Sequence, residues 1–228
     1  MAKIKRKKQT MEEKLNTLRA GVLGSNDGIL TVVGVLVSVA AATTDRFTIF
    51  IAGLSDLLAC AFSMVCGEYA SVSTQRDTEE SAVSTEQHLL KTNFAGELDT
   101  VKQYYVDKGV TPATSLAIAK DLLSKKPLET MVRVKYDIEL GHFLSPWDAA
   151  FSSLFSAAAG GLFPLMAMTF APNAVKWYAV ILAVVLTSAL TGFISSKLGN
   201  GLVKIAVIRN IVIGLITITI HYGVGRLF

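Results

Sequence analysis

The stretch AGVLGSNDGILTVVGVLVSVAAATTDRFTIFIAGLSDLLACAFSMVCGEY, residues 20–69, decides the fold of this chain. It contains two apolar blocks, 20–42 and 47–69, joined by the short polar link TTDR. Each block has the length of a helix that crosses a bilayer, which needs about 20 residues. These residues therefore predict a hairpin of two transmembrane helices.

Three more apolar blocks follow nearer the C-terminus, at residues 147–170, 177–195 and 202–222. Of the 228 residues, 51% are hydrophobic, and the mean hydropathy is +0.47. Soluble domains of this size rarely have so high a mean hydropathy. The sequence therefore predicts an all-α, polytopic membrane protein with about five transmembrane helices.

A polar stretch at residues 70–146 separates the second and third blocks, and it is too long for a simple loop. Its glycines and prolines divide it into four expected helices, at 70–91, 96–108, 112–124 and 127–143. We expect a small cytosolic helical domain whose first helix continues the second span without a break. The expected division is residues 1–69 for the basic N-terminal segment with spans one and two, 70–146 for this domain, and 147–228 for spans three to five.

Basic residues are distributed unevenly around the spans. Seven lysines and arginines precede Ala20, and the 70–146 stretch and the link around Lys197 are also basic, whereas the two other links hold one each. Because basic loops remain in the cytosol, the N-terminus and the insert are expected on the cytosolic side, and Phe228 on the far side. The net charge of +4 then reflects topology and contact with the lipid bilayer, and we expect no nucleic-acid partner.

Three acidic residues lie within or at the ends of the first two spans: Asp27, Asp56 and Glu68. An ionisable side chain inside a bilayer costs about 3 kcal/mol on insertion scales and usually has a function. Asp56, Cys60, Met64 and Glu68 recur at every fourth position, so they form one ridge of the second helix. Asp27 can face this ridge, and the hairpin places it level with residue 63 or Met64.

Each of these residues also has a purely structural interpretation. Asp27 can hydrogen-bond locally at a helix break, Asp56 can bond to a neighbouring hydroxyl, and Glu68 can simply be solvated at the interface. Cys60 is more often a small packing residue than a ligand. As a set, however, mixed oxygen and sulfur ligands favour iron(II) or manganese(II) over magnesium or calcium.

Several short motifs resemble those of the vacuolar iron transporter family. They are Gly24-Ser25-Asn26-Asp27-Gly28, Ser63-Met64-Val65-Cys66-Gly67-Glu68-Tyr69, Gln75-Arg76-Asp77, Glu139-Leu140-Gly141 and Gly161-Leu162-Phe163-Pro164-Leu165. The resemblance covers nearly the whole chain, and the combination of motifs is more specific than any one of them.

The resemblance implies a homodimer that exports ferrous iron, and sometimes manganese, from the cytosol in exchange for protons. It places Asp27, Asp56 and Met64 on the metal path and Glu68 near the inner mouth. Asp56 stands where a glutamate is usual, which keeps the charge but shortens the reach. The ion is the transported substrate, and we expect no cofactor. The membrane is either a prokaryotic plasma membrane or that of an acidic, vacuole-like organelle.

The resemblance also implies metal binding by glutamates and a methionine pair of the cytosolic insert. Glu86, Glu97 and Glu139 fall at three of these glutamate positions. Two further glutamate positions hold uncharged residues, and Lys135 and Tyr136 fall where the methionine pair would be. The predicted metal site of the insert is therefore depleted.

The leading interpretation is a proton-coupled divalent-metal transporter for Fe²⁺ or Mn²⁺. One alternative is a manganese-selective family member in which the insert is structural. Another is a membrane adaptor that transports nothing and binds a partner through its cytosolic helices. An enzyme is not expected, because the sequence shows no nucleophile–base pair, no histidine-rich metal cluster and no phosphate-binding glycine loop.

Overall fold

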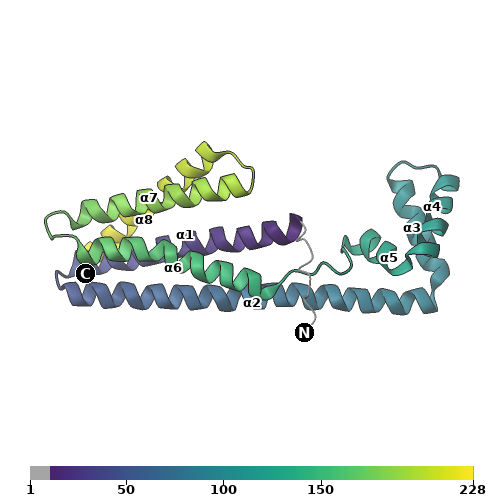
Figure 1. Ribbon diagram of the computed structural model, residues 1–228, viewed down its shortest axis with the longest axis horizontal. Helices are drawn as coiled ribbons and strands as arrows, with labels where there is room; N and C mark the ends of the chain where they lie inside the picture. The colour runs from purple at the N-terminus through teal and green to yellow at the C-terminus, as the bar shows by residue number, and fades with distance from the viewer. Residues whose placement is uncertain (1–10, 228) are drawn as a thin grey trace, which may run out of the picture. The chain divides into compact units, whose positions relative to one another are not determined.

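The computed structural model describes residues 11–227, and for residue 12 only the backbone. Residues 1–10, which hold five of the seven basic residues before Ala20, lie outside the described residues, and so does Phe228, which is expected on the far side. Within these bounds the chain forms eight helices (Figure 1): α1 Met11–Ala42, α2 Arg46–Thr92, α3 Phe94–Asp107, α4 Pro112–Lys125, α5 Pro127–Tyr136, α6 Pro146–Phe170, α7 Lys176–Leu198 and α8 Val203–Leu227.

Five helices of the described chain are long and apolar enough to cross a membrane: α1 from Glu13, α2, α6, α7 and α8. This confirms the all-α, five-span prediction. The spans agree with the apolar blocks. Helix α1, however, begins at Met11, so the polar residues just before its apolar block are helical as well. Helix α2 continues for 47 residues, through the apolar block and into the polar stretch, as expected.

The chain divides into two compact units. Among the described residues, the first unit contains those up to Ser71 together with those from Ser145 onward, and the second is Val72–Leu144. The five candidate spans meet in the first unit, and the short helices α3, α4 and α5 belong to the second.

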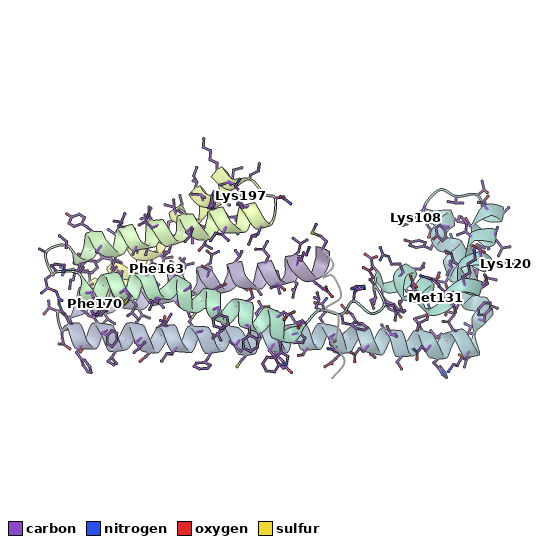
Figure 2. The ribbon with its side chains drawn as sticks, viewed as in Figure 1. Lys108, Lys120, Met131, Phe163, Phe170 and Lys197 are labelled. Atoms are coloured by element: carbon purple, nitrogen blue, oxygen red, sulfur yellow. The ribbon has the colours of Figure 1, made fainter. Side chains whose placement is uncertain are left out.

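Helix α1 is the centre of the first unit, where it packs against α6, α7 and α8. Its side chains Val32, Val33, Leu36 and Val37 are fully buried. Many large apolar side chains on the outer helices are exposed instead, among them Phe170 at the end of α6, labelled in Figure 2. An apolar core with an apolar exterior is the pattern expected for a bundle surrounded by lipid.

Small residues allow α1 and α6 to approach each other closely. A Cβ atom added at Gly28 of α1 would overlap the backbone carbonyl of Ala157 in α6, and one added at Gly160 of α6 would overlap the carbonyl of Ser25 in α1. Backbone contact of this kind is common between membrane helices that lack large side chains at their interface. The small residues at 157–161 therefore pack against α1 of the same chain.

The second unit has its own small core, formed by Val101, Ala119, Leu123 and Met131 from α3, α4 and α5. Figure 2 labels Met131 in this unit, together with Lys108 and Lys120, both exposed. Two of its helices start with a side-chain cap: Asn93 Oδ1 accepts from the N–H of Gly96, and Thr111 Oγ1 from that of Thr114.

Helix α5 is shorter than the helix predicted at 127–143. It ends at Tyr136, because Asp137 adopts the left-handed conformation with φ of 56°. The N–H of Ile138 then donates to the carbonyl of Val132, which closes the last turn. A second left-handed residue, Gly141 with φ of 84°, turns the chain before α6. The segment between the two helices is therefore a loop.

Candidate functional site

The predicted ridge of α2 faces inward. Cys60 and Glu68 are buried, Asp56 and Met64 are half-buried, and the residues on the opposite side of the helix, such as Phe62, are exposed. The ridge therefore does not point to lipid. Its side chains are directed to the interior of the first unit, where α1 lies.

Asp27 of α1 meets this ridge at Cys60. The Cys60 thiol donates to Asp27 Oδ2, with a sulfur–oxygen distance of 3.4 Å. Sequence spacing placed Asp27 level with residue 63 or Met64 instead. The difference arises because the link between the helices is only Thr43–Asp45, so the hairpin turns one residue earlier than expected and the level of Asp27 moves toward Cys60.

Asp56 lies about one helical turn from Cys60 along the ridge, and Thr31 of α1 lies close to both. Within residues 11–227, neither Asp56 Oδ2 nor Thr31 Oγ1 makes a hydrogen bond of standard geometry, although both atoms are buried and the Thr31 hydroxyl is close enough to interact with the Asp56 carboxylate. A buried oxygen without a partner is costly, so a cation or a proton at this position would stabilise the carboxylate.

Met64 contributes packing to the same region. Its side chain lies against the buried cluster of Cys60, Ala61 and Ala157, with Leu154 beside it. Met64 therefore packs against the same cluster that contains Cys60, as expected for a residue on the ridge. Its contacts are equally those of a core residue.

Glu68 is paired with a basic residue. Its side chain is only 6% exposed, and its Oε2 accepts a hydrogen bond from Arg19 Nη2 at 3.2 Å. This burial contradicts the alternative in which Glu68 is simply solvated. Arg19 itself is 57% exposed, so the ion pair lies at the edge of the first unit. No local sequence pattern indicates this role of Arg19, because the contact joins residues 49 positions apart.

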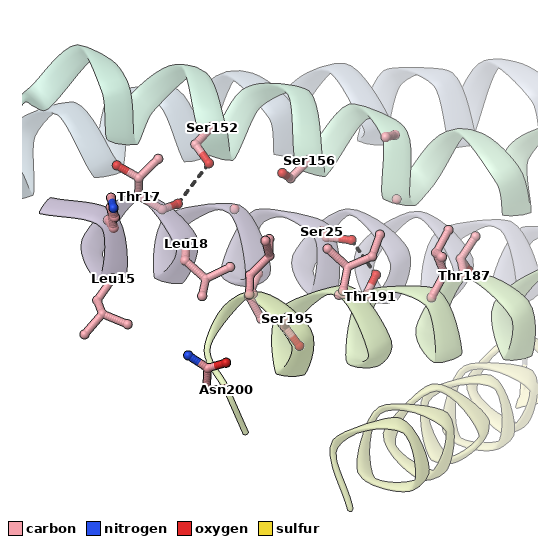
Figure 3. Close-up of a pocket in the computed structure, with 18 of the residues that line it drawn as sticks. Leu15, Thr17, Leu18, Ser25, Ser152, Ser156, Thr187, Thr191, Ser195 and Asn200 are labelled. Atoms are coloured by element: carbon pink, nitrogen blue, oxygen red, sulfur yellow. Dashed lines mark hydrogen bonds between the residues drawn. The ribbon is translucent and has the colours of Figure 1, made fainter. Parts of the chain in front are cut away.

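A cavity of about 630 Å³ lies between α1, α6 and α7 (Figure 3). Its polar lining consists mainly of hydroxyls. Ser152 Oγ donates to the backbone carbonyl of Thr17 at 2.9 Å, and the hydroxyls of Ser25 and Thr191 lie 2.8 Å apart. Among the described residues, its lining includes none of the predicted metal ligands. The cavity is thus separate from the acidic ridge.

In the second unit, the structure brings Glu86 and Glu97 together around Lys135. Lys135 Nζ lies 3.0 Å from Glu86 Oε2 and 2.7 Å from Glu97 Oε2. The hydroxyl of Tyr136 donates to Glu86 Oε1 at 3.1 Å. Glu139, the third predicted ligand of the insert, is exposed in the loop after α5. Within residues 11–227, no group of three or more His, Cys, Asp or Glu side chains is placed to hold a metal ion.

The pKa values of Lys135 and Tyr136, the two groups that contact these carboxylates, reflect this cluster. Burial lowers the pKa of Lys135, but hydrogen bonds to Glu97 and Glu86 and the charges of both carboxylates outweigh it and raise the pKa above its usual 10.5. The pKa of Tyr136 is also raised, first by burial and then by its hydrogen bond to Glu86. Both groups therefore hold their protons more tightly in the folded protein.

The fold and the ridge define a class: an integral membrane protein of five candidate spans, in which Asp27 of the first span contacts the inward-facing ridge of the second. The chain belongs to the VIT family, whose model matches residues 18–226. A vacuolar iron transporter of Acanthamoeba castellanii is 32% identical over 213 residues, which are 92% of this chain and 78% of that protein. Vacuolar iron transporter homolog 1 of Oryza sativa subsp. japonica is 31% identical, over 92% of this chain and 73% of its own length.

Proposed function

We propose that this chain is a proton-coupled transporter that exports a divalent cation, Fe²⁺ or Mn²⁺, from the cytosol. The names of the relatives, which are vacuolar iron transporters, support this proposal. The observation that carries it is the inward-facing set of Asp27, Cys60 and Asp56 between two spans, where a buried carboxylate oxygen makes no hydrogen bond of standard geometry among the described residues.

The proposed path begins at Glu68 on the side of the N-terminus. An incoming cation displaces Arg19 from Glu68 and is then attracted by the carboxylate. It moves along the ridge to Asp27, where the Cys60 thiol and the Met64 thioether offer sulfur, and on to Asp56. Protonation of the carboxylates from the opposite, acidic side releases the ion there. The bound protons are then carried to the cytosolic side in exchange for it.

This direction requires a cytosolic N-terminus, and the charge pattern of the loops supports that orientation. A divalent ion needs two negative charges, which Asp27 and Asp56 of one chain supply when both are ionised. We propose, as the resemblance implies, that the protein works as a homodimer. Its membrane is either that of an acidic, vacuole-type organelle or a prokaryotic plasma membrane.

Transport in liposomes tests the proposal. The purified protein should move Mn²⁺ or Fe²⁺ against a proton flux, followed with a metal-sensitive dye and a pH-sensitive dye. Asp27→Asn keeps the size of the side chain but removes its charge, and it should abolish both fluxes. Asp45→Asn is the matched control, because Asp45 is exposed and caps α2 through Thr48, a role that asparagine also fills.

Wild-type rates in the Asp27→Asn protein would refute the assignment of the path. If the wild-type protein is silent for every divalent ion tested, the adaptor interpretation is favoured instead. The manganese-selective alternative, in which the insert is structural, gains support from the position of Lys135 between Glu86 and Glu97. Competition between Fe²⁺ and Mn²⁺ for uptake separates it from iron transport.

A further inference from the structure

Two glutamates of the second unit are buried around a single lysine. Glu86 from α2 is fully buried and Glu97 from α3 is 5% exposed, while Lys135 from α5 is 21% exposed. The Lys135 ammonium bridges the two carboxylates, so one positive charge joins three helices. With Tyr136 donating to Glu86, the cluster contains two negative charges and one positive charge.

Buried carboxylates require compensation. An unpaired charge in a protein interior is strongly destabilising, and two carboxylates in one place repel each other. The ammonium donates to Glu86 and forms an ion pair of 2.7 Å with Glu97 Oε2, which makes no hydrogen bond of standard geometry among the described residues, and its charge lowers this repulsion. A bound divalent cation would act in the same way, since it too would sit between Glu86 and Glu97 and neutralise their charges.

We propose that the Lys135 ammonium is the built-in counter-ion of the Glu86–Glu97 carboxylate pair. The ammonium occupies the position that a divalent ion would need, so the second unit is held together without metal and Glu86 and Glu97 do not take up metal in this chain. Withdrawal of the ammonium would convert the pair into a site for a divalent cation. The inference concerns the architecture of the second unit and does not depend on whether the first unit transports ions.

A tethered cation differs from a bound one in a physical respect. Its local concentration is fixed by the chain, so the stability that it gives does not vary with the amount of free metal. A metal held by the same glutamates would stabilise the unit only when the metal was abundant. The second unit should therefore keep one structure across a wide range of metal concentrations.

Variants of the full-length protein in detergent micelles test the proposal. Mn²⁺ binding is measured from the electron paramagnetic resonance signal of the free ion. Local structure is measured by amide hydrogen exchange in peptides that cover residues 86–97 and 127–136. Any Mn²⁺ bound by the first unit should be equal in wild-type protein and in Glu86→Gln/Glu97→Gln.

Lys135→Met removes the charge but keeps the apolar stem. We expect exchange in both peptides to become on the order of tenfold faster or more without metal. Added Mn²⁺ should slow it again, with one additional Mn²⁺ bound per chain. Combining Lys135→Met with Glu86→Gln and Glu97→Gln should restore slow exchange without metal and remove the additional Mn²⁺. Lys135→Arg, the matched control, should behave like the wild-type protein.

Two results would overturn the proposal. One is a Mn²⁺ ion that wild-type protein binds and Glu86→Gln/Glu97→Gln loses. The other is exchange in Lys135→Met that is no faster than in the wild-type protein. Should Lys135→Met fail to fold, recovery of folded protein in the triple variant supports the proposal, and failure of the triple variant as well contradicts it.

Discussion

Replacing Arg19 by glutamine is expected to strengthen the uptake of a divalent cation from the side of the N-terminus. Arg19 Nη2 donates to Glu68 Oε2 at 3.2 Å, so an incoming cation must displace the guanidinium before it reaches this carboxylate. Arg19→Gln leaves Glu68 charged and removes a positive charge that repels the ion. Both effects should lower the apparent KM for the metal.

The size of the effect follows from the geometry. Two unit charges 3.2 Å apart attract each other by about 1 kcal/mol in water and by about 5 kcal/mol at an effective dielectric constant of about 20. The Arg19 side chain is 57% exposed, and solvent screening therefore reduces the interaction to about 1 kcal/mol. This energy corresponds to an apparent KM about fivefold lower, since 1.4 kcal/mol is a factor of about ten.

The assay is the initial rate of Mn²⁺ uptake into proteoliposomes over a series of Mn²⁺ concentrations. Arg76→Gln is a matched control, because Arg76 pairs with Glu80 on an exposed face of α2 and should leave the apparent KM unchanged. Glu68→Gln should raise the apparent KM, and adding Arg19→Gln to it should bring no improvement. An unchanged or higher apparent KM in Arg19→Gln, or a decrease that persists without the Glu68 carboxylate, would refute the reasoning.

Three further predictions concern other parts of the chain. Gly28→Ala should lower the free energy of unfolding by about 1–3 kcal/mol, because its methyl group overlaps a carbonyl of α6, whereas Gly223→Ala, with open space around it, should have little effect in the same thermal unfolding assay. Cys60→Ala removes a sulfur ligand and should reduce the preference for Fe²⁺ over Mn²⁺ about two- to fivefold in competition uptake; an unchanged preference would exclude the thiol as a ligand. The raised pKa values of Lys135 and Tyr136 mean that both favour the folded protein while protonated, so their stabilisation is complete below about pH 10 and is lost as the pH rises through the folded-state pKa values. Circular dichroism between about pH 9 and about pH 12 should show the second unit losing stability, and constant stability would contradict this prediction.

Much of the fold could be predicted because helix length and apolar runs are local properties. The block expected at 147–170 is observed as Pro146–Phe170, and the one at 177–195 as Lys176–Leu198. The end of α5 could not be predicted in the same way. Its left-handed Asp137 depends on hydrogen bonds that close the last turn, and aspartate carries no strong signal for that conformation.

The candidate site was predicted only in part, for a different reason. Spacing along α2 correctly placed Cys60 and Glu68 on one inward face, since a single helix fixes that relation. The partners of these side chains come from distant positions: Asp27 is 33 residues from Cys60, and Arg19 is 49 from Glu68. Helix period does not determine such pairings, because they depend on the exact length of a turn and on how helices rotate about their axes.

The interlocked backbones of α1 and α6 limit how the first unit can move. With Gly28 seated on one carbonyl and Gly160 on another, neither helix can slide along its neighbour by a fraction of a turn without a collision of main-chain atoms. We therefore expect α1 and α6 to move as one rigid body in any rearrangement of the bundle. Asp27 moves with this pair, so a shift or rotation of α2 against the pair changes the distance between the Asp27 carboxylate and the ridge.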